Sequence, residues 1–410
     1  MRVANNAGAS DSTGGALDFT GKLLILLSGL LSALCLTAIN SVLPSIEREL
    51  ARGPDDAVLV KQLLGAVALA MAAGAPLGGY LADRIGLRRT LFIAASVYTV
   101  AGTAGLYLSS LPLLLVSRLF LGLSAAAIQV LGLTMVNTQL SGNTRAKWMG
   151  IHVSFAIFGT LFIHPLAGQL GEISWRLPFA LYGSGAMLLL GLLFGSGVAA
   201  PAAGKAEAAS FQPAGPGILV WFPWHYLVLS FAIGAMTFLP TVSIPFQLRE
   251  QAGATPAMIS YVLLGSSVLG MIMAYLYGPA RRILSAHAAF ALGFGVASTG
   301  ALIAASASTL PVVLLGIGLH GLGVSWFVPN IMTALGSKVT KQQQGRAAGL
   351  VKAAHFLAMP ICVQLIQPFI RQYGEVIAMK AVAAIGFAMF VLMLGRMLTL
   401  RTARPLVPAG

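Results

Sequence analysis

The sequence predicts an all-α membrane protein of twelve transmembrane helices arranged as two similar six-helix bundles. Of the 410 residues, 57% are hydrophobic and only 9% are charged, which is far less charge than soluble domains carry. Apolar stretches of about 20 residues recur along the chain, each long enough to cross the roughly 30 Å hydrocarbon core as a helix. Because lipid offers no partners for backbone N–H and C=O groups, these stretches are expected to be helical.

Breaks at charged, glycine-rich or proline-rich points divide the chain into twelve spans. The first six are predicted at residues 23–46, 59–82, 90–109, 112–136, 148–170 and 178–199. The second six are predicted at residues 224–247, 257–278, 287–308, 311–335, 347–369 and 376–398. The first span is too long for the apolar region of a signal peptide, so we keep it as a helix.

The loops set the expected orientation and boundaries. Most of the 25 Lys and Arg residues fall on the same side of the membrane as the N-terminus, and basic loops stay in the cytoplasm. We therefore expect cytoplasmic tails at 1–22 and 399–410, a cytoplasmic linker at 200–222, and helical bundles at 23–199 and 223–398. The expected location is the bacterial inner membrane. Because the positive charge lies in short loops, we expect no nucleic-acid partner.

The two halves repeat each other weakly. Glycines of the first half recur 199 residues later at equivalent points of equivalent helices, with Gly79, Gly122 and Gly150 matching Gly278, Gly321 and Gly349. Parallel repeats about an axis along the membrane normal build one major class of secondary transporter. A substrate pathway is therefore expected between the halves.

The loop after the second span carries a family motif. It reads Gly79-Tyr80-Leu81-Ala82-Asp83-Arg84-Ile85-Gly86-Leu87-Arg88-Arg89, and it resembles the G-x-L-a-D-r-x-G-r-k loop of the major facilitator superfamily. Leu87 stands where a basic residue is usual. The resemblance implies a drug or metabolite antiporter-like transporter with a conformational latch between helices 2 and 11, formed by Gly79, Asp83, Arg84, Gly86, Arg88 and Arg89. The alternative is a solvated basic turn that only sets topology.

Helices 4 and 5 carry weaker matches to the same family. Arg118 and Gly122 fit a pattern that resembles l-x-x-x-R-x-x-q-G-x-g-a-a, and a cation inside a span is a functional candidate by default. Arg118 can instead reach the outer interface as a snorkelling side chain. His164-Pro165 and Gly168 resemble a degenerate form of the G-P-x-x-G-G element of the superfamily's antiporters.

Ionisable groups inside the predicted spans are basic or imidazole. The 11 acidic residues are all expected in loops, at helix ends or in tails, whereas Arg118, Lys352, His164, His320 and His355 fall within spans. This pattern favours an anionic or neutral solute over a cation. His320 or His355 is expected to respond to protons, since imidazole titrates near neutral pH. The alternative for each is a core histidine bonded to a backbone carbonyl.

Polar and aromatic residues at helical spacing complete the predicted cavity wall. They are Thr37 and Asn40 on helix 1, Gln129 on helix 4, Thr237 and Thr241 on helix 7, and Trp326 and Asn330 on helix 10. Some of these side chains are expected only to pack between helices.

The resemblance and the charges together predict a secondary active transporter that moves a small organic solute by alternating access. Proton-coupled efflux of a drug-like or metabolic compound is the first hypothesis, and proton-coupled uptake of an organic anion is the alternative. No P-loop, H-E-x-x-H or nucleophile-elbow motif occurs, so a membrane-embedded enzyme is the weaker rival. We expect no cofactor and no metal, the proton as coupling ion, and a monomer in the lipid bilayer.

Overall fold

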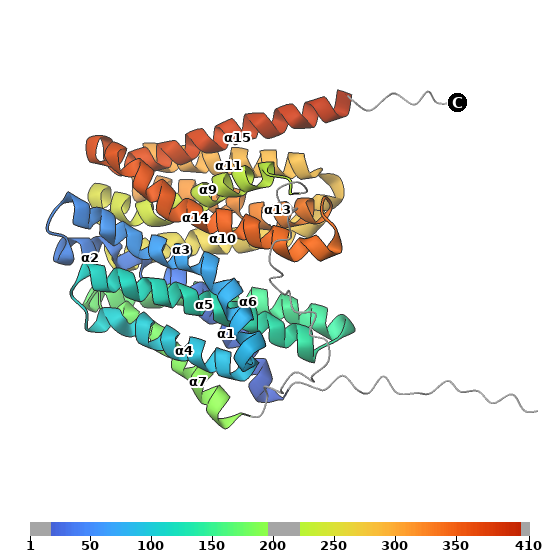
Figure 1. Cartoon of the computed structure of the whole chain (residues 1–410). Coiled ribbons are helices and arrows are strands. Elements are labelled where there is room, and N and C mark those ends of the chain that lie inside the picture. The colour runs from blue at the N-terminus through green and yellow to red at the C-terminus, as the bar shows by residue number, and fades with distance from the viewer. Residues whose placement is uncertain (1–17, 196–221, 403–410) are drawn as a thin grey trace, which may run out of the picture.

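In the computed structural model, which describes residues 18–195 and 222–402, the regular elements are helices. The first half contains α1 (Phe19–Thr37), η1 (Asn40–Val42), α2 (Leu43–Leu50), α3 (Pro54–Ile85), α4 (Leu87–Thr103), η2 (Ala104–Leu106), α5 (Leu111–Gln139), α6 (Gly142–Ile173), η3 (Leu177–Ser184) and α7 (Gly185–Phe194). The second half contains α9 (His225–Ala252), α10 (Pro256–Ile283), α11 (Ala286–Ser306), α12 (Leu310–Val324), α13 (Phe327–Gly336), α14 (Lys341–Tyr373) and α15 (Val376–Thr402). In Figure 1 the first half is the lower layer and the second half the upper layer.

Eleven helical stretches among the described residues are long and apolar enough to cross a membrane. The helix at the position of the third predicted span, α4, has 17 residues and continues into η2. The predicted all-α, multi-pass membrane fold is confirmed. The predicted linker at 200–222 and most of both predicted tails lie outside the described residues.

Besides the third, three more of the predicted continuous spans are subdivided. The first is divided into α1, η1 and α2, and Pro44 lies in the first turn of α2. The sixth begins as the 3₁₀ helix η3 before α7. The tenth is interrupted at Ser325 and Trp326, between α12 and α13. Pro329 has no N–H with which to bond the carbonyl four residues earlier, so the helix is weakest at this point.

Small residues bring the helices of each half together. Gly122 on α5 packs against Val67 of α3, and Gly321 on α12 packs against Ser266 of α10. The two glycines are 199 residues apart in the sequence, and so are their two partners. The internal repeat therefore extends to tertiary contacts. In lipid, where burying apolar surface gives helices little reason to associate, such close packing is a main source of helix–helix affinity.

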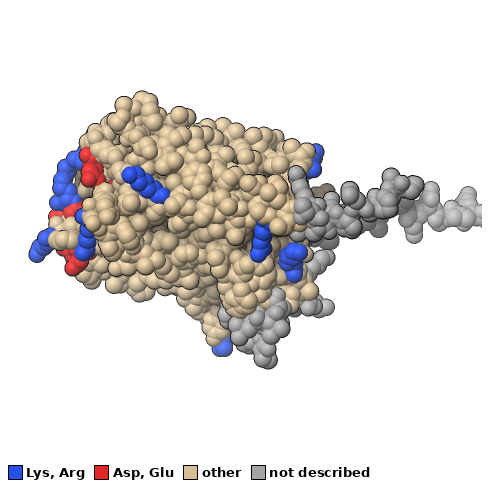
Figure 2. Space-filling view, turned by 90° about the horizontal axis from the view of Figure 1, so that it is seen from above, with Lys and Arg blue, Asp and Glu red and all other residues tan. Residues whose placement is uncertain are grey.

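The two ends of the molecule differ in charge. The end that carries α2 and the α14–α15 connection, at the left of Figure 1, is called here the closed end. The opposite end, where α1 begins and α15 finishes, is called the tail end. On the face shown in Figure 2, basic and acidic side chains mix at the closed end, whereas only basic side chains are visible at the tail end.

Candidate functional site

The described hydrogen bonds and ion pairs between the two halves lie toward the closed end, from the middle of α14 outward. They are Lys61 with Glu375, Arg371 with Asp55 at 2.7 Å, Gln62 Nε2 to the Pro360 carbonyl at 3.0 Å, the Ala257 N–H to Glu172 at 2.9 Å, and Gln169 Nε2 to Tyr261 at 3.2 Å. Two regions carry these bonds: α3 with α14 and the connection that follows it, and α6 with α10. The halves are therefore joined at one end of the pathway between them.

A buried ion pair joins α3 to the connection between α14 and α15. Lys61 Nζ donates to Glu375 Oε1, and the two residues are only 3% and 8% exposed. The Lys61 ammonium also lies 4.8 Å from the centre of the Phe246 ring of α9. Burial raises the pKa of Glu375, Lys61 opposes this rise, and Glu250 adds to it. Each charge depends on the other, because an uncompensated buried charge is costly.

The α6–α10 contact depends on glycine. A Cβ atom on Gly168 would lie 2.6 Å from Ser260 Cβ and 3.0 Å from Ala257 Cα, so no side chain fits between the helices. His164 lies one helical turn earlier on the same face. It is 5% exposed and has no hydrogen-bond partner among the described residues. The helix 5 element noted in the sequence therefore lies at the boundary between the halves.

Replacing Gly168 by alanine is expected to hold the closed end apart. The new methyl group overlaps Ser260, and overpacking of this kind costs about 1–3 kcal/mol, which shifts the equilibrium between closed and open ends by roughly fivefold to a hundredfold. The check is the distance between spin labels at Ile173 and Met258, in a background with Cys35 and Cys362 replaced. Gly265→Ala, on α10 with no atom within 4 Å of the added Cβ, is the matched control. Equal distances in the two variants would contradict the prediction.

Several buried polar atoms near the closed end have no partner among the described residues. They are Asn40 Oδ1, Ser41 Oγ, Ser260 Oγ, Gln367 Nε2 and Glu375 Oε2. A buried polar group without a partner costs about 1–3 kcal/mol. Water that enters when the closed end opens would hydrate these groups.

Arg118 lies inside the first half and not between the halves. Its guanidinium is 0% exposed and donates to the carbonyls of Ala101 and Gly102, at 2.8 and 2.9 Å. These carbonyls belong to the last turn of α4, where the helix has no partners of its own and carries partial negative charge. The same group lies about 5 Å from the rings of Phe179 and Tyr182. This geometry is that of a packing cation that joins α5, α4 and η3.

His320 lies in the core of the second half. Its ring nitrogens lie 2.9 Å from the carbonyl oxygens of Ala297 and Met236, so the ring connects α12 to α11 and α9. The side chain is 4% exposed. The structure therefore places His320 in the core position that the sequence left open as the alternative to a proton-responsive group.

The other predicted cavity residues fall into two groups. Trp326 and Asn330 hold the second half together, through Nε1 to the Met273 carbonyl at 2.7 Å and Nδ2 to the Ala286 carbonyl at 2.9 Å. Thr37, Thr237 and Thr241 are partly exposed, and each hydroxyl donates to the carbonyl four residues earlier in its own helix. Gln129 is partly exposed with no described hydrogen bond, and Asn40 is buried.

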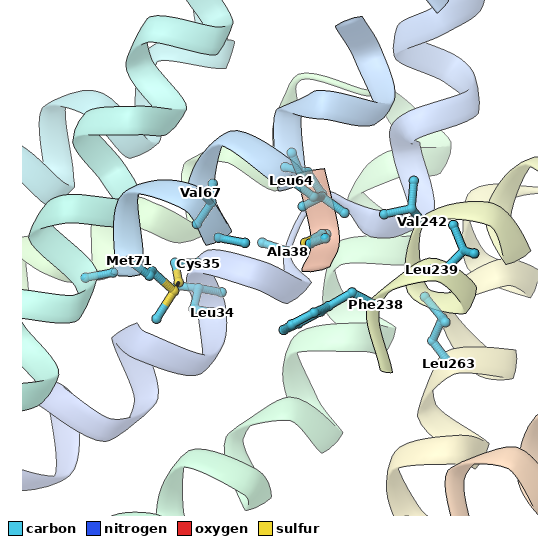
Figure 3. Packing of buried hydrophobic residues seen from close by; sticks show 14 of the residues in the cluster. Leu34, Cys35, Ala38, Leu64, Val67, Met71, Phe238, Leu239, Val242 and Leu263 are labelled. Carbon is cyan, nitrogen blue, oxygen red and sulfur yellow. Dashed lines mark hydrogen bonds between the residues drawn. The ribbon is translucent and has the colours of Figure 1, made fainter. Parts of the chain in front are cut away.

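An aromatic group on α9 and α14 lies beside the predicted cation Lys352. Phe238 lies 4.9 Å from His355 and 5.9 Å from Phe356, and the two phenylalanine rings are stacked. Lys352 precedes Phe356 by one helical turn and is exposed. Figure 3 shows Phe238 near Leu34 of α1 and Ala38, the residue that follows α1, where the two halves face each other. The structure thus brings Lys352 and His355 together with apolar side chains.

The predicted latch is not engaged in this conformation. Asp83 is exposed and forms no ion pair with any described residue. Arg84 lies over the ring of Tyr80, and Arg88 donates to carbonyls at the end of α7. Gly86 has φ +91°, a conformation that favours glycine, and it makes the sharp turn from α3 to α4. Arg89 lies in the first turn of α4 and is exposed, and Gly79 lies about two turns before the end of α3 with no atom within 4 Å of an added Cβ.

The arrangement of two repeated helical halves joined at one end has a counterpart among known proteins. A family model described as Major Facilitator Superfamily matches residues 25–246. This chain belongs to the Major Facilitator Superfamily. The family resemblance seen in the Asp83 loop is confirmed by this match.

Individual members of the superfamily are more distant. The quinolone resistance protein NorA of Staphylococcus aureus strain Mu50 is 26% identical over 219 residues, which are 51% of this chain and 54% of NorA. The hexuronate transporter of Bacillus subtilis strain 168 is 25% identical over 177 residues, or 42% of this chain and 39% of that protein. The alignments thus span about half the length, or less, of the curated relatives that the chain matches. A crystal structure of a D-xylose-proton symporter superposes with TM-score 0.76 at 17% identity, covering 92% and 97% of the two chains; at this identity it shows the fold.

Sequence reasoning missed the two residues at the centre of the closed end of this superfamily member. Lys61 lies near the start of the span predicted at 59–82 and Glu375 just before the span predicted at 376–398, and each position alone is typical of a solvated charge. The available signal was weak: each residue lies within one turn of a predicted span boundary. Nothing in the sequence indicated that residues more than 300 positions apart would pair.

Proposed function

We propose that this chain is a proton-coupled secondary transporter that exports a small organic solute across the bacterial inner membrane by alternating access. The observation that carries the proposal is the placement of the described polar contacts between the halves at the closed end. Contacts of this kind can break and re-form as two rigid halves rock about a central site. The relationship to a quinolone resistance protein supports export.

The charges support an orientation for this conformation. The basic tail end lies in the cytoplasm under the positive-inside rule, so the closed end faces outward and the pathway faces inward. When the pathway opens outward, the tail end closes and Asp83 comes within reach of α14. The latch of Gly79, Asp83, Arg84, Gly86, Arg88 and Arg89 engages at that stage, as the family resemblance implies. The transporter acts as a monomer and uses no cofactor.

Uptake of an organic anion with protons is the second candidate. Two observations favour it: Lys352 is an exposed cation within a span, and one relative is a hexuronate transporter. Basic residues at the tail end also raise the local concentration of anions. Both candidates use the same rocking motion, and the direction of coupled proton flow separates them.

The test uses sealed proteoliposomes with an internal pH indicator and an imposed pH gradient. A quinolone and glucuronate serve as probes, and the direction of solute movement is compared with that of the protons. Export predicts opposite directions, whereas uptake predicts the same direction. Solute movement without proton movement would remove proton coupling, and no protein-dependent movement of either probe would count against both candidates.

A further inference from the structure

The side of α14 that faces the space between the halves can be located from contacts of its neighbours. The Pro360 carbonyl accepts from Gln62 of α3, which marks the side toward the first half. The Val351 carbonyl accepts from Ser230 of α9, which marks the side toward the second half. Successive residues of an α-helix are rotated by about 100° around its axis. Lys352 therefore points between the direction of Val351, toward the second half, and that of Pro360, toward the first.

The opposite side of α14 faces lipid. Ile361 lies nine residues after Lys352, which is half a turn of the helical wheel away, and it is 41% exposed. Leu365 continues that side and is 66% exposed. Lys352 therefore points away from the lipid-facing side, into the space between α3 and α9.

Lys352 is a cation without a described counter-ion at membrane depth. It lies five residues, or about 8 Å, from the midpoint of α14, and it is exposed. None of the ion pairs among the described residues includes it. It is also on the tail-end side of Pro360, beyond the contacts that join the halves. A cation held at such depth is costly unless water or an anion compensates it.

The side chains next to Lys352 determine the shape of an anion that can bind there and offset its charge. Phe356 follows Lys352 by one turn toward the closed end and stacks on Phe238, with the His355 ring 5.7 Å from Phe356. This aromatic surface suits a flat apolar body. A monoanion with an aromatic ring can place its carboxylate on Lys352 and its ring against the half-buried Phe356, which the buried Phe238 (8% exposed) supports from behind.

We infer that Lys352, Phe356 and Phe238 form the substrate site and that its substrate class is the aromatic monocarboxylates. The inference rests on the proposed transport function and narrows it. The acids of the closed end are separated from Lys352 along α14, so the carboxylate meets a cation with no competing partner. The charge-assisted bond supplies affinity and orientation, and the stacked rings select planar solutes.

Binding of three matched probes to the purified full-length protein tests the inference. The probes are naphthoate, naphthamide and naphthylmethylammonium, which share one ring system and differ in charge. Naphthoate is expected to bind at least about tenfold more tightly than either of the others, because one charge-assisted bond supplies that factor. Lys352→Gln removes the preference, Lys352→Arg retains it, and Phe356→Leu weakens all three probes. Lys380→Gln, an exposed lysine on α15, is the matched control.

The outcomes separate the site from the proposed function. Tighter binding of the cation, an unchanged preference in Lys352→Gln, or no binding of any probe would overturn the site. If naphthoate binds through Lys352 and no solute crosses proteoliposomes, transport fails and the site stands. If a solute crosses equally in wild type and Lys352→Gln, transport stands and the site fails.

Discussion

Replacing Lys61 by methionine is expected to open the closed end at neutral pH. The substitution leaves the Glu375 carboxylate buried without its cation, and breaking a buried pair in this way costs about 3 kcal/mol or more. A cost of this size shifts the equilibrium between closed and open ends by roughly a hundredfold. Opening hydrates Glu375, so the open end becomes the more stable arrangement.

The same variant is expected to close again in acid. Burial raises the pKa of Glu375, and without Lys61 nothing described opposes the rise. The proton is then bound more tightly in the closed arrangement than in the hydrated one. By linkage, the closed end is favoured at low pH and is lost as pH rises through the raised pKa.

Spin labels at Ile173 and Met258 measure the opening as a longer distance in Lys61→Met at neutral pH. The control is the double variant Lys61→Met with Glu375→Leu, which replaces the pair by two apolar side chains. It is expected to stay closed at every pH tested, since such replacements are often neutral or stabilising. If Lys61→Met stays closed at neutral pH, the Lys61–Glu375 ion pair does not hold the two halves together.

Replacing Arg118 by alanine is expected to destabilise the first half. The variant loses charge-assisted bonds to the last turn of α4 and leaves a cavity beside Phe179 and Tyr182. Together these losses amount to about 3–5 kcal/mol. Arg118→Lys keeps the charge but lacks the planar guanidinium that lies over the Phe179 and Tyr182 rings, so it is expected to fall between alanine and wild type.

The measurement is the unfolding temperature of purified protein in detergent, with Arg282→Ala on α10 as an exposed control. We expect a clear decrease for Arg118→Ala and no change for the control. An unchanged unfolding temperature together with lost solute flux would contradict the packing role. It would return Arg118 to the functional role that its position in a membrane span first indicated.

The fold was accessible from sequence because each part of it depends on local properties. A span is recognisable from about 20 apolar residues, and the Asp83 loop from its spacing. The subdivision of helix 10 was less visible, although Pro329 was present, because proline permits a break without requiring one.

The candidate site was only partly accessible, because the sequence gives a residue's depth in a helix but not the direction of its side chain. Arg118 and Lys352 are both cations within spans. Arg118 is bonded to α4 carbonyls inside the first half. Lys352 is exposed, and we infer that it points into the space between the halves. Which neighbour each helix face meets is set by the packing of other helices.

The sequence by itself determined the all-helical membrane fold, the internal repeat and the family, because hydropathy, spacing and loop charge act over a few residues to a few turns. Only the tertiary structure decided which charges meet. Lys61 and Glu375 lie more than 300 residues apart, and their pairing depends on how two separately packed halves touch. The interaction that closes one end of the pathway therefore belongs to the assembled molecule and to neither half alone.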